Sequence, residues 1–148
     1  MRISAKGRYA FAALIEIARQ AKAGEAVSAA CISEKLKISK IFLEQTFAAL
    51  KKYGIIQSTK GAKGGYLLAR EARMISALDV LSAVESTLLE KADATAAEQS
   101  PSTEAALRDG LFGKLDKAIE SCLSAITIQD LAEQADRQNS EQAFMMYM

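Results

Sequence analysis

The chain has 148 residues, 50% of them hydrophobic and 25% charged, which is ordinary for a globular protein with a core of its own. Two cysteines exclude a disulfide framework, and the absence of histidine excludes histidine-based catalysis and histidine metal ligands. No apolar run is long enough to span a bilayer, and charged residues interrupt the weak signal-peptide pattern near the N-terminus. We therefore expect a cytoplasmic protein with reduced thiols.

The net charge of +1 conceals a strong asymmetry between the two halves of the chain. Residues 1–75 hold 14 basic and 5 acidic side chains, whereas residues 76–148 hold 5 basic and 13 acidic ones. A basic half of this kind suits a polyanion such as nucleic acid. The alternative is two solvated surfaces that merely neutralise each other.

The first half predicts a compact set of helices followed by a hairpin. In chain order the pattern predicts helices over residues 9–22, 28–36 and 39–53 and strands over residues 55–60 and 65–70. Gly24 is a natural stop for the first helix, whose polar side includes Glu16, while Ser28 and Ser39 are good N-caps for the other two. This order is that of a winged helix-turn-helix domain, which we assign to residues 1–72.

The second half predicts a connecting region, residues 73–103, and a long helix with a C-terminal tail, residues 104–148. In chain order it contains a helix from 76 to 86, a loop from 90 to 103 that includes Pro101, a long helix from 104 to 125 and a short helix from 127 to 135. The apolar stripe of the long helix consists of Leu107, Leu111, Leu115, Ala118, Cys122 and Ile126. The fold class is therefore mainly α with a small β-hairpin wing.

The third predicted helix has one apolar and one polar face. Leu43, Phe47 and Leu50 recur at helical spacing and should point into the core. The opposite face carries Ile41, Glu44, Gln45, Ala48 and Lys52. Glutamine can pair with adenine, glutamate can accept from cytosine, and isoleucine can meet a thymine methyl group, so this face suits a major groove. Ser39 and Lys40, at the positive end of the helix, are placed for phosphate.

The turn of the predicted hairpin is basic and rich in glycine. Lys60, Gly61, Lys63 and Gly64 lie at its tip, where lysines can reach a phosphate or a minor groove. A P-loop is excluded because glycine, not serine or threonine, follows Lys63. A G-x-x-G clamp on RNA fits residues 61–64 and stays an alternative, although strands rather than helices flank it.

Other classes of function have less support in the sequence. An enzyme is not expected, because the chain has no histidine, no evident pair of catalytic carboxylates and no phosphate-binding loop. A protein-interaction adaptor without DNA affinity would use the acidic half and the apolar ending, residues 143–148. Arg2, Lys6 and Arg8 precede the first helix and offer a second contact to a nucleic-acid backbone.

Four motifs in order carry a family resemblance: MRISAKGRYA at residues 1–10, LEQ at 43–45, LKKYGII at 50–56 and GAKGGYLL at 61–68. With these motifs the chain resembles the IscR–NsrR–CymR family of bacterial repressors, in register from residue 1 to about 135. The resemblance implies a winged-helix homodimer on a palindromic operator, with residues 39–45 and 60–65 against double-stranded DNA. It also implies that the long helix of residues 104–148, through its apolar stripe, is the dimerisation element. Together with the residue patterns, it gives a DNA-binding set of Arg2, Lys6, Arg8, Ser39, Lys40, Ile41, Phe42, Glu44, Gln45, Lys52, Lys60, Gly61, Lys63 and Gly64.

The cysteine pattern separates branches of that family. Iron–sulfur members carry three close cysteines before the long helix, whereas residues 90–106 contain none here. Cys31 and Cys122 fall on separate predicted helices, so we predict no cluster, metal or cofactor, and we expect Cys31 to be buried. The cysteine-free loop and the apolar ending resemble the CymR branch, which implies repression of cysteine metabolism through a cysteine-synthase-type partner enzyme.

Overall fold

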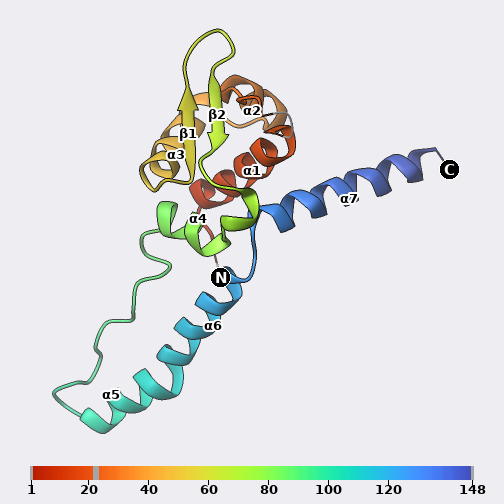
Figure 1. Ribbon diagram of the computed structural model, residues 1–148. Helices are drawn as coiled ribbons and strands as arrows, with labels where there is room; N and C mark the ends of the chain where they lie inside the picture. The colour runs from red at the N-terminus through yellow and green to blue at the C-terminus, as the bar shows by residue number, and fades with distance from the viewer. Residues whose placement is uncertain (1, 22–23, 148) are drawn as a thin grey trace.

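The computed structural model, which describes residues 2–21 and 24–147, is mainly helical with one two-stranded hairpin (Figure 1). The helices are α1 (Ala5–Gln20), α2 (Ala29–Leu36), α3 (Lys40–Lys52), α4 (Ala77–Val84), α5 (Pro101–Leu107), α6 (Gly113–Ser124) and α7 (Ile128–Met146); the strands are β1 (Ile56–Thr59) and β2 (Gly65–Leu68). Among the described residues, none of the helices is long and apolar enough to cross a membrane. The mainly α class with a hairpin wing is confirmed.

Helix α1 begins four residues earlier than the apolar pattern predicts. Ser4 is its N-cap, and the Ser4 Oγ accepts the Gly7 N–H at 3.1 Å. The predicted end at Lys22 lies outside the described residues, and Gly24 has the positive φ of +71° expected of a stop. The prediction that Glu16 lies on the polar side was wrong. Glu16 is 6% exposed and forms ion pairs with Arg19 at 3.2 Å and Lys35 at 2.5 Å, so it can be buried without being unpaired.

The helix-turn-helix forms as the sequence predicts. The Ser28 Oγ accepts the Cys31 N–H at 3.1 Å and caps α2. The Ser39 side chain caps α3 by accepting the Phe42 N–H at 3.5 Å. Between the two helices, Lys37 takes the left-handed conformation, with φ of 57°, which makes the connection short.

The hairpin is antiparallel, with Ile56 opposite Leu68 and Thr59 opposite Gly65. Each strand is two residues shorter than predicted. An additional bridge, which the sequence pattern did not indicate, joins Val27 to Tyr66 through N···O distances of 2.9 and 2.8 Å. A Cβ at Gly65 would lie 2.5 Å from the Val27 carbonyl oxygen, so this close approach requires glycine.

The core lies between α1, α3 and the base of the hairpin, and it extends into the second half. Its largest fully buried side chains include Leu14, Ile17, Ile32, Leu43, Phe47 and Leu50. Ile75, Val80 and Ile128 belong to the same cluster. The starts of α4 and α7 are paired through the Ser76–Thr127 bridge, and each begins with a capping box. The first turns of both helices are thereby fixed to the domain.

Three predictions for the second half need correction. Pro101 opens α5 instead of lying in a loop, because proline suits the first position of a helix. The long helix runs from Pro101 to Ser124 but contains a π-helical segment, Arg108–Phe112. Helix α7 continues to Met146, eleven residues beyond the predicted end. Figure 1 shows α5–α6 and α7 leaving the domain in different directions.

Candidate nucleic-acid interface

The inward face of α3 packs entirely into the core. Leu43, Phe47 and Leu50 are 0% exposed, as the helical spacing predicts. Phe47 also packs on the Tyr66 ring of β2, with ring centroids 4.4 Å apart. The Thr46 hydroxyl is buried and donates to the Phe42 carbonyl oxygen at 3.0 Å. These contacts fix the rotation of α3 about its axis and therefore decide which side chains face outward.

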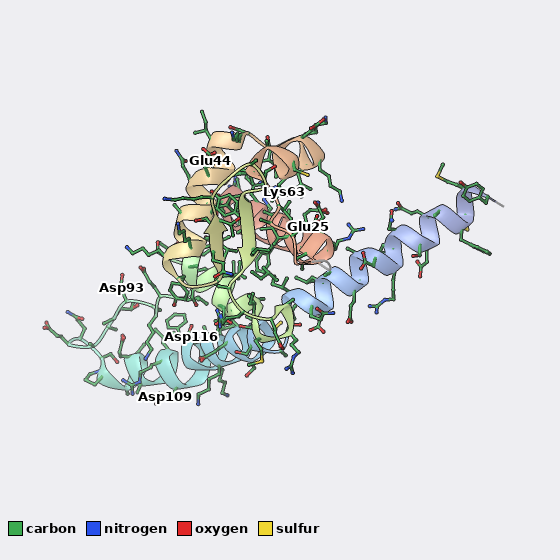
Figure 2. The ribbon with its side chains drawn as sticks, turned by 45° about the horizontal axis from the view of Figure 1, so that its top comes forward. Glu25, Glu44, Lys63, Asp93, Asp109 and Asp116 are labelled. Carbon is green, nitrogen blue, oxygen red and sulfur yellow. The ribbon has the colours of Figure 1, made fainter. Side chains whose placement is uncertain are left out.

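The outward face of α3 is uncovered. Ile41 is 71% exposed, and Glu44, Gln45, Ala48 and Lys52 are exposed as well. Figure 2 shows Glu44 at the outer edge of the helix. A 71% exposed isoleucine between polar side chains has no role in the core, but it could meet a thymine methyl group. The face therefore offers hydrogen-bonding groups and an apolar contact, with the small Ala48 permitting close approach.

The start of α3 is exposed, although Ser39 and Phe42 also make contacts within the fold. The Ser39 hydroxyl already serves the helix cap, whereas Lys40 is exposed and lies 4.0 Å from Glu44. Phe42 is 36% exposed, because its ring packs edge-on against Tyr9 of α1 with centroids 5.3 Å apart. Phe42 thus joins α3 to α1, and only part of its side chain is available to a partner.

The tip of the hairpin, residues 60–64, forms a basic wing. Lys60 and Lys63 are exposed and have no ion pair with any residue that the structure describes. Gly61 takes φ of +107°, and the Gly64 N–H closes the turn onto the Gly61 carbonyl oxygen at 3.0 Å. Figure 2 shows Lys63 at the wing, far from Asp93, Asp109 and Asp116 around the loop and α5–α6.

A mixed polar and apolar groove separates the wing from α2. Its lining includes Gln20, Glu25, Cys31, Lys63 and Gly64. Cys31 is exposed here, which contradicts the expectation of a buried thiol. Helix α2 turns Ala29 and Ile32 into the core, so Cys31 between them faces outward, with its Sγ 3.8 Å from the Gln20 Oε1.

The residues before and at the start of α1 form a second basic segment, residues 2–8, which we call the arm. Arg2 and Arg8 are exposed, whereas Lys6 is half-buried. The Arg8 guanidinium carbon lies 5.7 Å from the centroid of the Tyr9 ring. Glu85, at the end of α4, accepts the Ser4 N–H at 2.9 Å. Nothing in the local sequence pattern pointed to Glu85, because the contact joins residues 81 positions apart.

The predicted apolar stripe is largely open to solvent. Leu111 and Leu115 are 46% and 49% exposed, Ala118 and Cys122 are exposed, and Leu107 and Ile126 are half-buried. Beside it lies an apolar groove of about 610 Å³ between α1, α4 and α6, whose lining includes Phe11, Leu81, Leu88, Ile119, Leu123 and Ile126. The end of α7 is also apolar and open, with Phe144 66% and Tyr147 93% exposed. Apolar surface of this extent marks an interaction site.

Taken together, the capped helix pair, the outward face of α3 and the lysine wing define a winged helix-turn-helix protein. The chain belongs to the Rrf2 family, described as an iron-dependent transcriptional regulator, whose model matches residues 3–134. Members of this family are regulators of transcription and not enzymes, as the sequence predicted.

Relatives and solved structures agree on the family. IscR of Xenorhabdus nematophila, an HTH-type transcriptional regulator, is 37% identical over 150 residues, covering 95% of this chain and 88% of the relative. CymR, the global cysteine regulator of B. subtilis, is similar in structure with a TM-score of 0.74 and 28% identity, covering 90% of this chain and 98% of that one. IscR of T. potens gives a TM-score of 0.71 and 32% identity, covering 91% and 88%.

The family is described as iron-dependent, but the side chains in the described part of the chain do not form an evident iron site. Cys31 lies on α2 and Cys122 on α6, and the chain contains no other cysteine and no histidine. Across the described residues, no group of three histidine, cysteine or acidic side chains could hold a metal ion. Iron–sulfur clusters need several close thiolates, so the residues of a single chain do not fit one.

Proposed function

We propose that the protein is a sequence-specific DNA-binding repressor that acts as a homodimer on a palindromic operator without an iron–sulfur cluster. The observation that carries this proposal is the exposed polar face of α3 beside a wing whose two lysines have no ion pair in the described part of the chain. The family supplies the class of activity, regulation of transcription. The geometry supplies the surface through which that activity would act.

In this proposal α3 enters a major groove and the wing follows the backbone toward the adjacent minor groove. Gln45 would pair with adenine, and Ile41 would meet a thymine methyl group. Lys60, Lys63 and the arm would neutralise phosphates, so binding should weaken steeply with added salt. Lys60 brings a point charge without the planar fork of an arginine, so it would hold phosphate better than it would read a base.

The homodimer is supported by the open stripe on α6. Exposed leucines at 111 and 115 and the adjoining apolar groove are surfaces that a second copy would cover. A two-fold axis at α6 would present two copies of α3 to two half-sites one helical turn, or a multiple of it, apart. The operator should therefore be an imperfect palindrome.

Control of cysteine and sulfur metabolism is the finer part of the proposal. It is supported by the similarity to CymR of B. subtilis and by the lack of cysteine in residues 90–106. The curated IscR relatives favour a different branch, although the donor set for a cluster is missing from a single chain. In the CymR-like case the signal would arrive through a partner such as a cysteine-synthase-type enzyme, for which the open end of α7 is an available surface.

The test starts with genomic DNA. The purified full-length protein is mixed with sheared DNA of its own organism at about physiological salt, and bound fragments are sequenced. A shared palindrome upstream of cysteine and sulfur genes supports the whole proposal. A palindrome upstream of other genes supports the repressor and contradicts the branch, whereas no enrichment contradicts specific binding by the isolated protein.

A substitution then tests the groove assignment. Gln45→Ala should cost about 1–3 kcal/mol of binding free energy and relax the preference at one base pair. Gln138→Ala, which alters an exposed glutamine of α7, is the matched control and should change neither. If Gln45→Ala leaves the sequence preference intact, α3 does not read the bases through Gln45.

A further inference from the structure

A carboxylate from the second half of the chain holds the first residues of α1. The Oε1 of Glu85 accepts both the backbone N–H of Ser4, at 2.9 Å, and the Ser4 hydroxyl. The Ser4 Oγ in turn accepts the Gly7 N–H at 3.1 Å. Glu85 therefore completes the cap of α1 from outside the helix, at the end where the helix dipole favours a negative charge.

The packing around this contact leaves room for the carboxylate and for little else. Gly7 is buried, and a Cβ at this position would lie 2.6 Å from the Glu85 Oε1 and 2.7 Å from the Ile3 Cγ2. Any side chain at position 7 would displace the side chain of Glu85 or that of Ile3. The glycine here serves a close approach between α1 and the end of α4.

The position of the contact in the fold connects two parts of the molecule. Ser4 lies between Arg2 and Arg8 in the arm, and all three line one surface pocket with Glu85. Glu85 follows the last residue of α4 and precedes the segment that leads to α5 and α6. The arm is thereby attached to the chain segment that joins the winged domain to the apolar stripe.

We propose that Glu85 is a positioning residue for DNA binding, which acts by holding the arm against the end of α4. This inference rests on the proposed DNA-binding function. With Ser4 fixed by four hydrogen bonds, Arg2 and Arg8 start from an ordered backbone when they meet phosphate. Without Glu85, Ser4 loses two of these hydrogen bonds and the residues before α1 fray, so binding must order them at an entropic cost.

The experiment compares Glu85→Gln with Glu85→Ala in the full-length chain. Both variants remove the negative charge, which would itself repel DNA, but only glutamine keeps an oxygen that can accept from Ser4. We expect Glu85→Ala to bind operator DNA about three- to tenfold more weakly than Glu85→Gln. Its salt slope should also be smaller by about one or two, with the sequence preference unchanged. Equal affinity and equal slope for the two variants overturn the proposal.

Adding Arg2→Ala separates positioning from a general loss of stability. In the Glu85→Gln background, Arg2→Ala should weaken binding and lower the salt slope by about one. In the Glu85→Ala background the same change should have a clearly smaller effect, because the arm is already loose. Equal effects of Arg2→Ala in both backgrounds show that Glu85 does not act through the arm, and they overturn the proposal.

A measurement on the unmodified protein guards against a variant that fails to fold. In the absence of DNA, the Ser4 amide should exchange its hydrogen more slowly than the amide of Arg2, because only Ser4 donates to Glu85. Exchange at the rate of an unstructured peptide contradicts the contact, whatever the protein binds. Protection of Ser4 together with no binding to any duplex contradicts the proposed function and, with it, the positioning role.

Discussion

The two halves of the chain use their apolar side chains differently. Around α1 and α3, residues such as Leu14 and Phe47 are 0% exposed and are enclosed by their own chain. Along α5–α7, Leu115 is 49% exposed and Phe144 is 66% exposed. The core around α1 and α3 is closed within one chain, with Val80 of α4 and Ile128 of α7 contributing to it, whereas the rest of the second half presents an apolar surface that no described part of the chain covers. Folding of the chain explains the buried apolar residues around α1 and α3. Association with another protein chain best explains the exposed apolar residues along α5–α7.

Charge follows the same division. The basic half carries exposed lysines on the wing and on α3, and the acidic half carries Asp93, Asp109 and Asp116 around the loop and α5–α6 (Figure 2). In the proposed complex the negative half would point away from phosphate, so the electrostatic attraction orients the protein on DNA. Under the proposed function, the first half would therefore contact the nucleic acid and the second half would contact protein.

The strongest test of this difference between the two halves is to truncate one apolar side chain in each. Phe47→Ala should lower the free energy of unfolding by about 3–5 kcal/mol, since it opens a cavity in a closed core. Leu115→Ala, measured by urea unfolding under dilute monomeric conditions, should change it by less than about 0.5 kcal/mol. A similar loss for both variants would show that Leu115 belongs to an intramolecular core.

The next largest effect concerns association. The double substitution Leu111→Glu and Leu115→Glu should weaken the proposed dimer by roughly 3 kcal/mol, about a hundredfold, because both leucines would lose their partner surface. Sedimentation equilibrium gives the dissociation constant directly. Lys117→Glu introduces the same residue away from the stripe on α6 and serves as the control. An unchanged oligomeric state in the double variant would place the dimer interface elsewhere.

The first half was largely predictable because its signals are local. Ser28 and Ser39 cap their helices, and the spacing of Leu43, Phe47 and Leu50 defines the buried face of α3. What local signals could not supply were long-range contacts. The burial of Glu16 depends on Lys35 from another helix, and the Ser4–Glu85 contact spans 81 positions.

The second half was less predictable, since its apolar pattern serves contacts outside the chain. The predicted start of α7 at residue 127 was correct, but the helix continues eleven residues beyond the predicted end at 135. Pro101 was read as part of a loop, although proline also opens helices. The π-helical segment Arg108–Phe112 has no signature in the helical periodicity of the sequence, and Gly110 is the one residue in it that disfavours a regular helix.

A substitution with a smaller expected effect tests the difference in charge between the two halves. Lys63→Ala should weaken binding to every duplex about fivefold at roughly 0.15 M salt and lower the salt slope by about one, since one phosphate contact is lost. Lys117→Ala removes the same charge from the acidic half and should leave both quantities unchanged. Fluorescence anisotropy across a salt series measures them. Equal slopes for the two variants would contradict the assignment of the nucleic-acid surface to the first half.

The smallest effect tests how α7 is attached to the first half. The Arg19 Nε donates to Asp136 at 2.8 Å, and this hydrogen bond, together with the charge of Glu16, raises the pKa of Arg19 above its usual value. Because both side chains are partly exposed, at 21% and 40%, solvent screens the pair and Asp136→Ala should cost only about 0.5–1 kcal/mol. Gln134→Ala, on the same helix, is the matched control in urea unfolding. A cost above about 2 kcal/mol for Asp136→Ala would mean that α7 stabilises the winged domain as a whole. Amide exchange of α7 should then slow to the rate of the core, and the two halves would unfold as one unit.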